Sequence, residues 1–183
     1  MLAYLQGLSL GLAYVAPIGV QNLFVINAGL SQPRAAAYRT ALIVIFFDVT
    51  LALAGFFGIG ALIEHSELIR KGVLLAGSLV VMYMGLRLML SREVAGPAIN
   101  VNIPLMKTIG MACVVTWFNP QAIIDVSLLL GSFRVALPPE ESGLFLWGVV
   151  CASCLWFLSL TTISSLFKNR FTPRLLRIIN LVC

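Results

Sequence analysis

Apolar residues occur in long runs along this chain, and short stretches rich in proline, glycine or charge separate them. A helix needs about 20 mostly apolar residues to cross about 30 Å of hydrocarbon, and five runs meet that length. The last apolar residues, 178–183, would rise only about 9 Å as a helix, so we interpret them as part of a truncated sixth. The predicted membrane helices cover residues 2–30, 40–63, 72–90, 108–133 and 143–167, with the start of the sixth at 174–183.

Proline interrupts two of these runs. Pro17 and Gly19 stand within the first, and Pro120 stands within the fourth. A proline inside a helix removes one backbone hydrogen bond, and the freed carbonyls then need a polar partner. A simple kink is one interpretation of each break, and a binding site for a transported solute is the other. The amide side chains beside the two breaks are those of Gln21, Asn22, Asn119 and Gln121.

The positions of the breaks indicate a repeat. They fall in the first and fourth predicted spans, so each break lies in the first span of a half that contains three helices. Broken helices at corresponding places in two halves are a pointer to the substrate site of a transporter. Because each half has an odd number of spans, the second half would be inverted. The sequence therefore predicts an all-α integral membrane bundle of six helices in two inverted three-helix repeats, forming one domain over residues 1–183.

Two acidic residues lie deep in apolar runs, Asp48 in the second and Asp125 in the fourth. A charged residue at a helix centre costs about 2.5–3.5 kcal/mol on insertion scales, so neither should face lipid. Two neutral carboxyls that hydrogen-bond neighbouring helices would be a structural explanation. Substrate binding or proton coupling is the functional explanation, and we expect both acids to face one cavity between the two breaks.

The composition excludes several classes of protein. Hydrophobic residues make up 60% of the 183 residues and charged residues 10%, whereas a soluble domain has about 25% charged residues. So few charges cannot cover the surface of a soluble enzyme, and they do not suit a disordered segment or a nucleic-acid-binding module. The main partner of this surface is expected to be the lipid bilayer.

The basic residues predict an orientation. Nine of them lie in or beside the loops that follow the first, third and fifth spans, and three lie beside the other loops. Cytoplasmic loops are enriched in lysine and arginine, so the N-terminus is predicted on the periplasmic side. The nine are Arg34, Arg39, Arg87, Arg92, Lys107, Lys168, Arg170, Arg174 and Arg177.

Enzymatic and cofactor chemistry finds no support in the motifs. The chain has no phosphate-binding loop, no Ser/His/Asp set and no zinc-ligand spacing, so no enzyme activity, cofactor or metal site is expected. Cys151 and Cys154 form a C-x-x-C pattern within an apolar run. Buried cysteines usually act as small packing residues, and a membrane thiol-redox protein stays open as the alternative.

Two motifs carry a resemblance to a known family. Residues 14–22 read Tyr-Val-Ala-Pro-Ile-Gly-Val-Gln-Asn, and residues 116–125 read Thr-Trp-Phe-Asn-Pro-Gln-Ala-Ile-Ile-Asp. These resemble the first-helix and fourth-helix motifs of the lysine exporter (LysE) family, nearest its arginine/lysine exporter branch. Further segments that fit the family are Asp48 and residues 130–132, 152–157 and 177–182.

The resemblance implies a multi-pass protein of the bacterial inner membrane. Its substrates would be amino acids, most of all L-arginine and L-lysine, exported from the cytoplasm by proton- or ion-coupled alternating access. A cationic substrate agrees with two buried acids that have no basic residue at similar depth. Exporters of neutral amino acids or of metal cations on the same fold are the alternatives. The sequence leaves the oligomeric state open, a homo-oligomer included.

Overall fold

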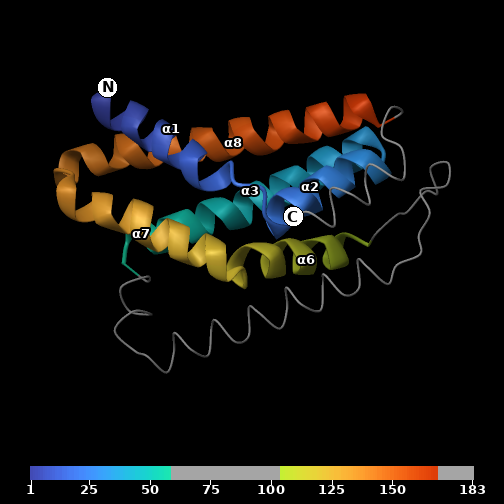
Figure 1. Cartoon of the computed structure of the whole chain (residues 1–183), viewed down its shortest axis with the longest axis horizontal. Helices are drawn as coiled ribbons and strands as arrows, with labels where there is room; N and C mark the ends of the chain where they lie inside the picture. Colours follow the sequence, from blue (N-terminus) through green and yellow to red (C-terminus); the bar gives the residue numbers. More distant parts are fainter. Residues whose placement is uncertain (59–103, 169–183) are drawn as a thin grey trace.

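A computed structural model describes residues 1–58 and 104–168 (Figure 1), and every element in these ranges is helical. Two long helices are unbroken, and each is long and apolar enough to cross a membrane. The other long helices form two bent pairs. The elements are α1 (Leu2–Val15), α2 (Val20–Ser31), α3 (Arg34–Phe56), α6 (Leu105–Trp117), α7 (Pro120–Ala136), the 3-10 turn η1 (Pro139–Glu141) and α8 (Ser142–Phe167).

The two predicted breaks divide helices. The expected continuous span over 2–30 is the pair α1 and α2, which meet at 80°, and the expected span over 108–133 is the pair α6 and α7, bent by 60°. Pro17 lies between the first two helices, and Pro120 is the first residue of α7, where proline is well tolerated. If each bent pair is one span, the described residues contain up to four spans.

Helix boundaries also depend on turn residues that apolar runs do not reveal. The second predicted span was 40–63, but α3 begins at Arg34, directly after Pro33. It ends at Phe56, and Gly58 has a φ of 95°, a left-handed conformation that glycine adopts readily at the end of a helix. The predicted spans 72–90 and 174–183 lie outside the described residues.

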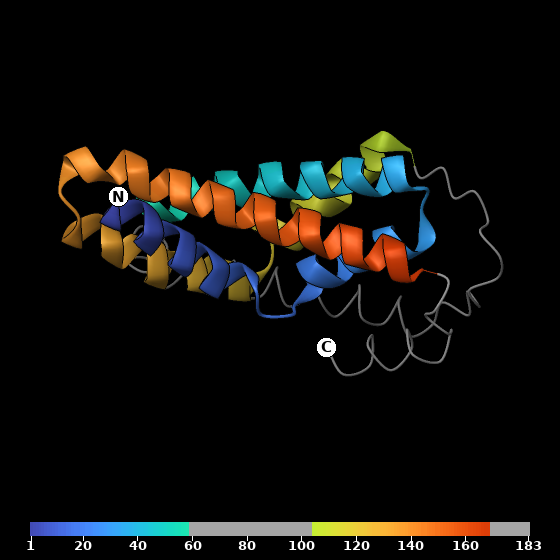
Figure 2. The ribbon, with the colours of Figure 1, turned by 90° about the horizontal axis from the view of Figure 1, so that it is seen from above.

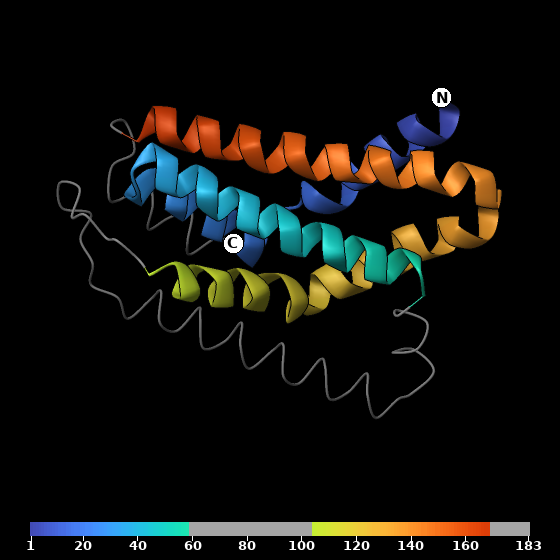
Figure 3. The same ribbon diagram turned by 180° about the vertical axis from the view of Figure 1, so that it is seen from behind.

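The helices run side by side with α3 and α8 in the middle. Helix α3 lies between α8 and the α6/α7 pair (Figure 3), and α8 runs between α3 and the α1/α2 pair (Figure 2). Along the long axis of Figure 1, α1/α2 and α8 run one way, whereas α3 and α6/α7 run the other. Each bent pair is thus followed in the described residues by an unbroken helix of opposite direction.

Helices α1 and α8 approach each other closely at glycines. A side chain at Gly7 would collide with the backbone oxygen of Phe145, and one at Gly148 would collide with that of Tyr4. Small residues let membrane helices approach closely and gain dispersion contacts. This contact fixes α1 beside the middle helices, and it brings the end of α1 towards α3.

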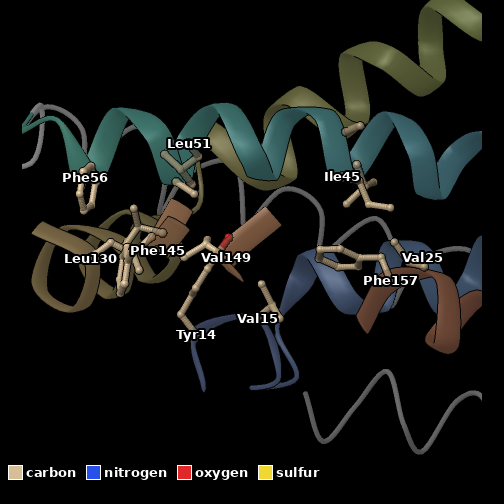
Figure 4. Close-up of a cluster of buried hydrophobic side chains, with 14 of the residues drawn as sticks. Tyr14, Val15, Val25, Ile45, Leu51, Phe56, Leu130, Phe145, Val149 and Phe157 are labelled. Atoms are coloured by element: carbon tan, nitrogen blue, oxygen red, sulfur yellow. The ribbon is translucent and has the colours of Figure 1, made fainter. Parts of the chain in front are cut away.

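The buried apolar side chains form one core between these helices (Figure 4). At one end Phe145 of α8 stacks on Phe56 of α3 and Phe133 of α7, with ring centroids 5.6 and 5.4 Å apart. Towards the other end Phe157 lies near Val25, and Tyr14 lies between the two groups. The core therefore joins α3, α7 and α8 at one end and α2 and α8 at the other.

Candidate functional site

The Asp48 side chain lies at the centre of a buried polar cluster. Its carboxylate is 1% exposed and accepts three hydrogen bonds from neutral groups. The Tyr14 hydroxyl and Ser153 Oγ each donate to Oδ2 at 2.6 Å, and Gln21 Nε2 donates to Oδ1 at 3.1 Å. Buried polar groups are normally hydrogen-bonded in this way, because an unpaired one is costly.

The three donors come from three different helices around the first break. Tyr14 is in the last turn of α1, Gln21 is in the first turn of α2, and Ser153 is in the middle of α8. Asp48 itself lies in the second half of α3. One carboxylate therefore ties both sides of the break to the two unbroken helices.

No positive side chain neutralises this carboxylate within the described ranges. The groups that bond to Asp48 there are a phenol, an amide and an alcohol, and none of the described lysines or arginines forms an ion pair with it. An intramembrane acid without a basic partner is a place where a proton or a cationic solute can bind. The cluster has the chemistry that a site for such a ligand needs.

Asn22 holds the broken backbone itself. Its Nδ2 donates to the carbonyl of Val15 at 2.9 Å and to that of Pro17 at 2.7 Å. Its Oδ1 accepts a hydrogen bond of 3.0 Å from the indole of Trp156 on α8. The backbone carbonyls that the break leaves without a helical partner thus accept hydrogen bonds from a side chain. The sequence predicted that they need such a partner.

The second break has a different set of contacts. Trp117, at the end of α6, donates its indole hydrogen to Thr50 of α3 at 3.2 Å. The preceding Thr116 is fully buried, and its hydroxyl has no hydrogen-bond partner among the described residues. Asn119 is half-buried and precedes α7, where its carbonyl accepts a hydrogen bond from the Ile123 amide. The side chain of Gln121 lies outside the part of the chain that the structure describes.

The two acids lie at different levels along α3. Asp125 is half-buried on α7, and its neighbour Val126 packs against Gly55 of α3. Gly55 is seven residues beyond Asp48, which is about 10 Å along a helix. Of the predicted site residues, the structure joins Asp48 and Gln21 directly and places Asn22 beside them, whereas Asp125 and Asn119 are not among the partners of Asp48.

The sequence did not single out Tyr14 or Ser153. Tyr14 precedes Pro17 by one helical turn, and Ser153 is the third residue of the Cys151–Cys154 pattern. The available signal was that both lie in segments that resemble the family, 14–22 and 152–157, close to a predicted break and within a cysteine pattern. Both cysteines are half-buried and free, and the described residues hold no group of three potential metal ligands.

Comparison with known proteins identifies the family. The model of the LysE type translocator matches residues 12–183, nearly the whole chain. The chain belongs to the LysE family. The family predicted from the two motifs is confirmed, and with its apolar helices this LysE-family chain is a multi-pass membrane transport protein.

Relatives in this family are named for one substrate. The chain is 33% identical over 98% of its length to the arginine exporter protein ArgO of Escherichia coli strain K12, covering 86% of that protein. It is 31% identical over 97% of its length to the protein of the same name from Pectobacterium atrosepticum, covering 88% of it. No solved structure matches the chain.

Proposed function

We propose that this chain exports amino acids from the cytoplasm across the bacterial inner membrane, with L-arginine as the first candidate substrate and L-lysine as the second. The observation that carries the proposal is the buried Asp48 carboxylate, which has only neutral donors among the described residues. Relatives named as arginine exporters support the choice of a cationic amino acid. The function is transport, without an enzymatic reaction.

Each part of the substrate has a chemical counterpart at the first break. A guanidinium or ammonium group would bind the Asp48 carboxylate through charge-assisted hydrogen bonds. The α-carboxylate would bind at the N-terminus of α2, where the first amides have no partner within the helix and carry the positive end of its dipole. Gln21 and Asn22 lie in that first turn, so we assign them to substrate binding.

The second break supplies the remaining groups of the proposed site. Asn119, Gln121 and Asp125 follow Trp117 around Pro120, and we assign them to substrate binding or to proton coupling. The Thr116 hydroxyl, which has no partner in the described part of the chain, supports this, because a buried polar group without a partner suits a place that a ligand occupies in another state.

The transport cycle is proposed to be alternating access, coupled to protons or ions, on a bundle of six helices in two inverted repeats. A bent pair followed by an unbroken helix occurs twice, and the two occurrences run in opposite directions (Figure 1). Rocking of such repeats around a fixed midplane site is the common mechanism of transporters built this way. We further propose that the N-terminus is periplasmic.

Export from cells tests the function. Cells that express the protein are loaded with labelled arginine or lysine, and efflux is measured for wild type, Asp48→Asn and Asp125→Asn. Removing one side of a buried ion pair costs about 3–5 kcal/mol, so we expect each variant to lose at least about 100-fold in transport. Glu140→Gln makes the matched change in an exposed turn and should export normally.

Two results would contradict the proposal. If wild-type cells export neither basic amino acid, the proposed substrate is wrong, and a panel of neutral amino acids and metal cations is tested next. If Asp48→Asn exports at the wild-type rate and is present at the same protein level, the proposed substrate site at Asp48 is wrong.

A further inference from the structure

The Asn22 side chain uses both of its amide hydrogens within the protein. They belong to Nδ2 and go to the carbonyls of Val15 and Pro17, at 2.9 and 2.7 Å. Both acceptors are close to Asn22 in the sequence, so these two bonds hold the bend between α1 and α2. They do not determine where the bent pair lies relative to the other helices.

The indole of Trp156 supplies a contact from a distant helix. Its Nε1 donates to Asn22 Oδ1 at 3.0 Å, across 134 residues of sequence. An indole nitrogen only donates and a backbone carbonyl only accepts, so these partners are compatible with one orientation of the Asn22 amide. A turned amide would place Oδ1 against two carbonyl oxygens and Nδ2 against the indole hydrogen. Trp156 therefore ties the bent pair to α8 at a defined point.

The segment that Trp156 ties down carries one of the donors to Asp48. Gln21 precedes Asn22 in the first turn of α2, and its amide donates to Asp48 Oδ1. Trp156 itself lies one turn beyond Ser153 on α8, and Ser153 donates to Oδ2. Residues three apart share one face of a helix, so one face of α8 contacts both the carboxylate and the first turn of α2.

The hydrogen bonds on Asp48 indicate where a cation can join them. A carboxylate has about four acceptor positions, and the described residues use three of them: Tyr14 and Ser153 on Oδ2, and Gln21 on Oδ1. The remaining position is on Oδ1, beside the Gln21 amide, whose own Oε1 is a second acceptor. The guanidinium of arginine is a rigid planar fork that needs a fixed spacing between two acceptors, whereas the ammonium of lysine is a point charge with rotatable donors.

We propose that Trp156 is a positioning residue that gives the transporter a preference for arginine over lysine. By holding Asn22 it fixes the first turn of α2, and with it the spacing between Asp48 Oδ1 and the Gln21 amide. Without the indole hydrogen the bent pair keeps the two local bonds of Asn22 but loses its defined position against α8. The spacing then varies, which weakens the binding of a rigid guanidinium more than that of an ammonium. The inference rests on the proposed export function.

Competition between the two amino acids measures this preference. Transport of labelled arginine into lipid vesicles that contain the purified protein is inhibited with unlabelled lysine or with unlabelled arginine. The half-inhibiting concentration of lysine is divided by that of arginine. We expect a ratio of at least about five for wild type and of about one for Trp156→Phe, which keeps an aromatic ring without the N–H. Loss of one ordinary hydrogen bond has an effect of about this size.

The other two tryptophans provide matched controls. Trp147→Phe makes the same change at an exposed position of α8 and should leave both the rate and the ratio unchanged. Trp117→Phe removes an indole that donates to Thr50 of α3 at 3.2 Å, and it should keep the ratio even if the rate falls. Asn22→Ala removes the acceptor of the Trp156 bond and should lower the ratio as Trp156→Phe does. The double variant should lower it no further.

The ratio separates a positioning role from a merely structural one. If Trp156→Phe lowers the rate but keeps the wild-type ratio, the inference is overturned. A double variant whose ratio falls well below that of either single variant overturns it as well, and so does a wild type without a preference, although the export function then stands. If wild type transports neither amino acid, the proposed function is wrong and this inference falls with it. Should Trp156→Phe fail to insert, the ratio of Asn22→Ala decides in its place.

Discussion

At the scale of single residues, Thr116 is the exception in a well-satisfied interior. Among the described residues its hydroxyl is the one fully buried side-chain group without a hydrogen-bond partner. Such a group costs about 1–3 kcal/mol, and valine has nearly the same shape without the hydroxyl. Thr116→Val should therefore stabilise the protein by about that amount, measured as a higher Tm in detergent. It should also weaken transport if the substrate uses the hydroxyl.

Thr161 provides the matched control for that substitution. It is equally buried, but its hydroxyl donates to the carbonyl of Phe157 at 2.7 Å. Thr161→Val should leave the Tm unchanged or lower it slightly. If Thr116→Val lowers the Tm more than Thr161→Val does, the idea of a costly unpaired hydroxyl is wrong.

The candidate site could be predicted from the sequence only where a residue conflicts with its surroundings. Asp48 stands out because a charge in an apolar run is expensive, and Gln21 stands out because it follows a proline break. Tyr14 and Ser153 conflict with nothing, since tyrosine and serine are ordinary in membrane helices. Their approach depends on the packing of α1 against α8, segments that are 139 residues apart at this contact.

At the scale of elements, the glycines of α1 and α8 determine how closely these helices approach. A methyl group at Gly148 would meet the backbone oxygen of Tyr4, and backbone cannot move aside as a flexible side chain can. Overpacking of this kind costs about 1–3 kcal/mol. Gly148→Ala should therefore lower the Tm, and it should weaken transport because it pushes α1, with Tyr14, away from α8.

Gly110 on α6 serves as the control for that change. A methyl group there meets nothing within 4 Å, and alanine favours a helix over glycine by about 0.5–1 kcal/mol. Gly110→Ala should raise the Tm or leave it unchanged. An equal decrease in both variants would contradict the close contact between α1 and α8.

The elements also show which boundaries an apolar pattern can predict. Proline marks the places where the first and fourth runs break, because it removes a helical hydrogen bond wherever it occurs inside a helix. The bend of 80° at the first break depends on Asn22, Trp156 and Asp48, which hold the ends from neighbouring helices. The bend angle and the helix lengths are thus set by tertiary contacts, and they cannot be predicted from a run of apolar residues.

At the scale of the whole molecule, the described charges separate between its two ends. Arg34, Lys107 and Lys168 lie at the end where α2 turns into α3, and Lys168 donates to the carbonyl of Gln32 in that turn at 3.0 Å (Figure 1). The opposite end carries Glu140 and Glu141 in η1, together with the N-terminus. Basic loops remain in the cytoplasm, so this separation supports the proposed orientation.

An impermeant maleimide tests that orientation on intact cells. In a chain whose own cysteines are replaced by serine, Pro139→Cys in the α7–α8 turn should react from outside, whereas Pro33→Cys in the α2–α3 turn should react only after permeabilisation. Both positions are exposed, so access to water does not distinguish them. The two turns lie at opposite ends of the molecule, so their labelling should be opposite in either orientation. The reverse pattern would place the N-terminus in the cytoplasm, and equal labelling of both sites would contradict the arrangement of α3 and α8 as membrane spans.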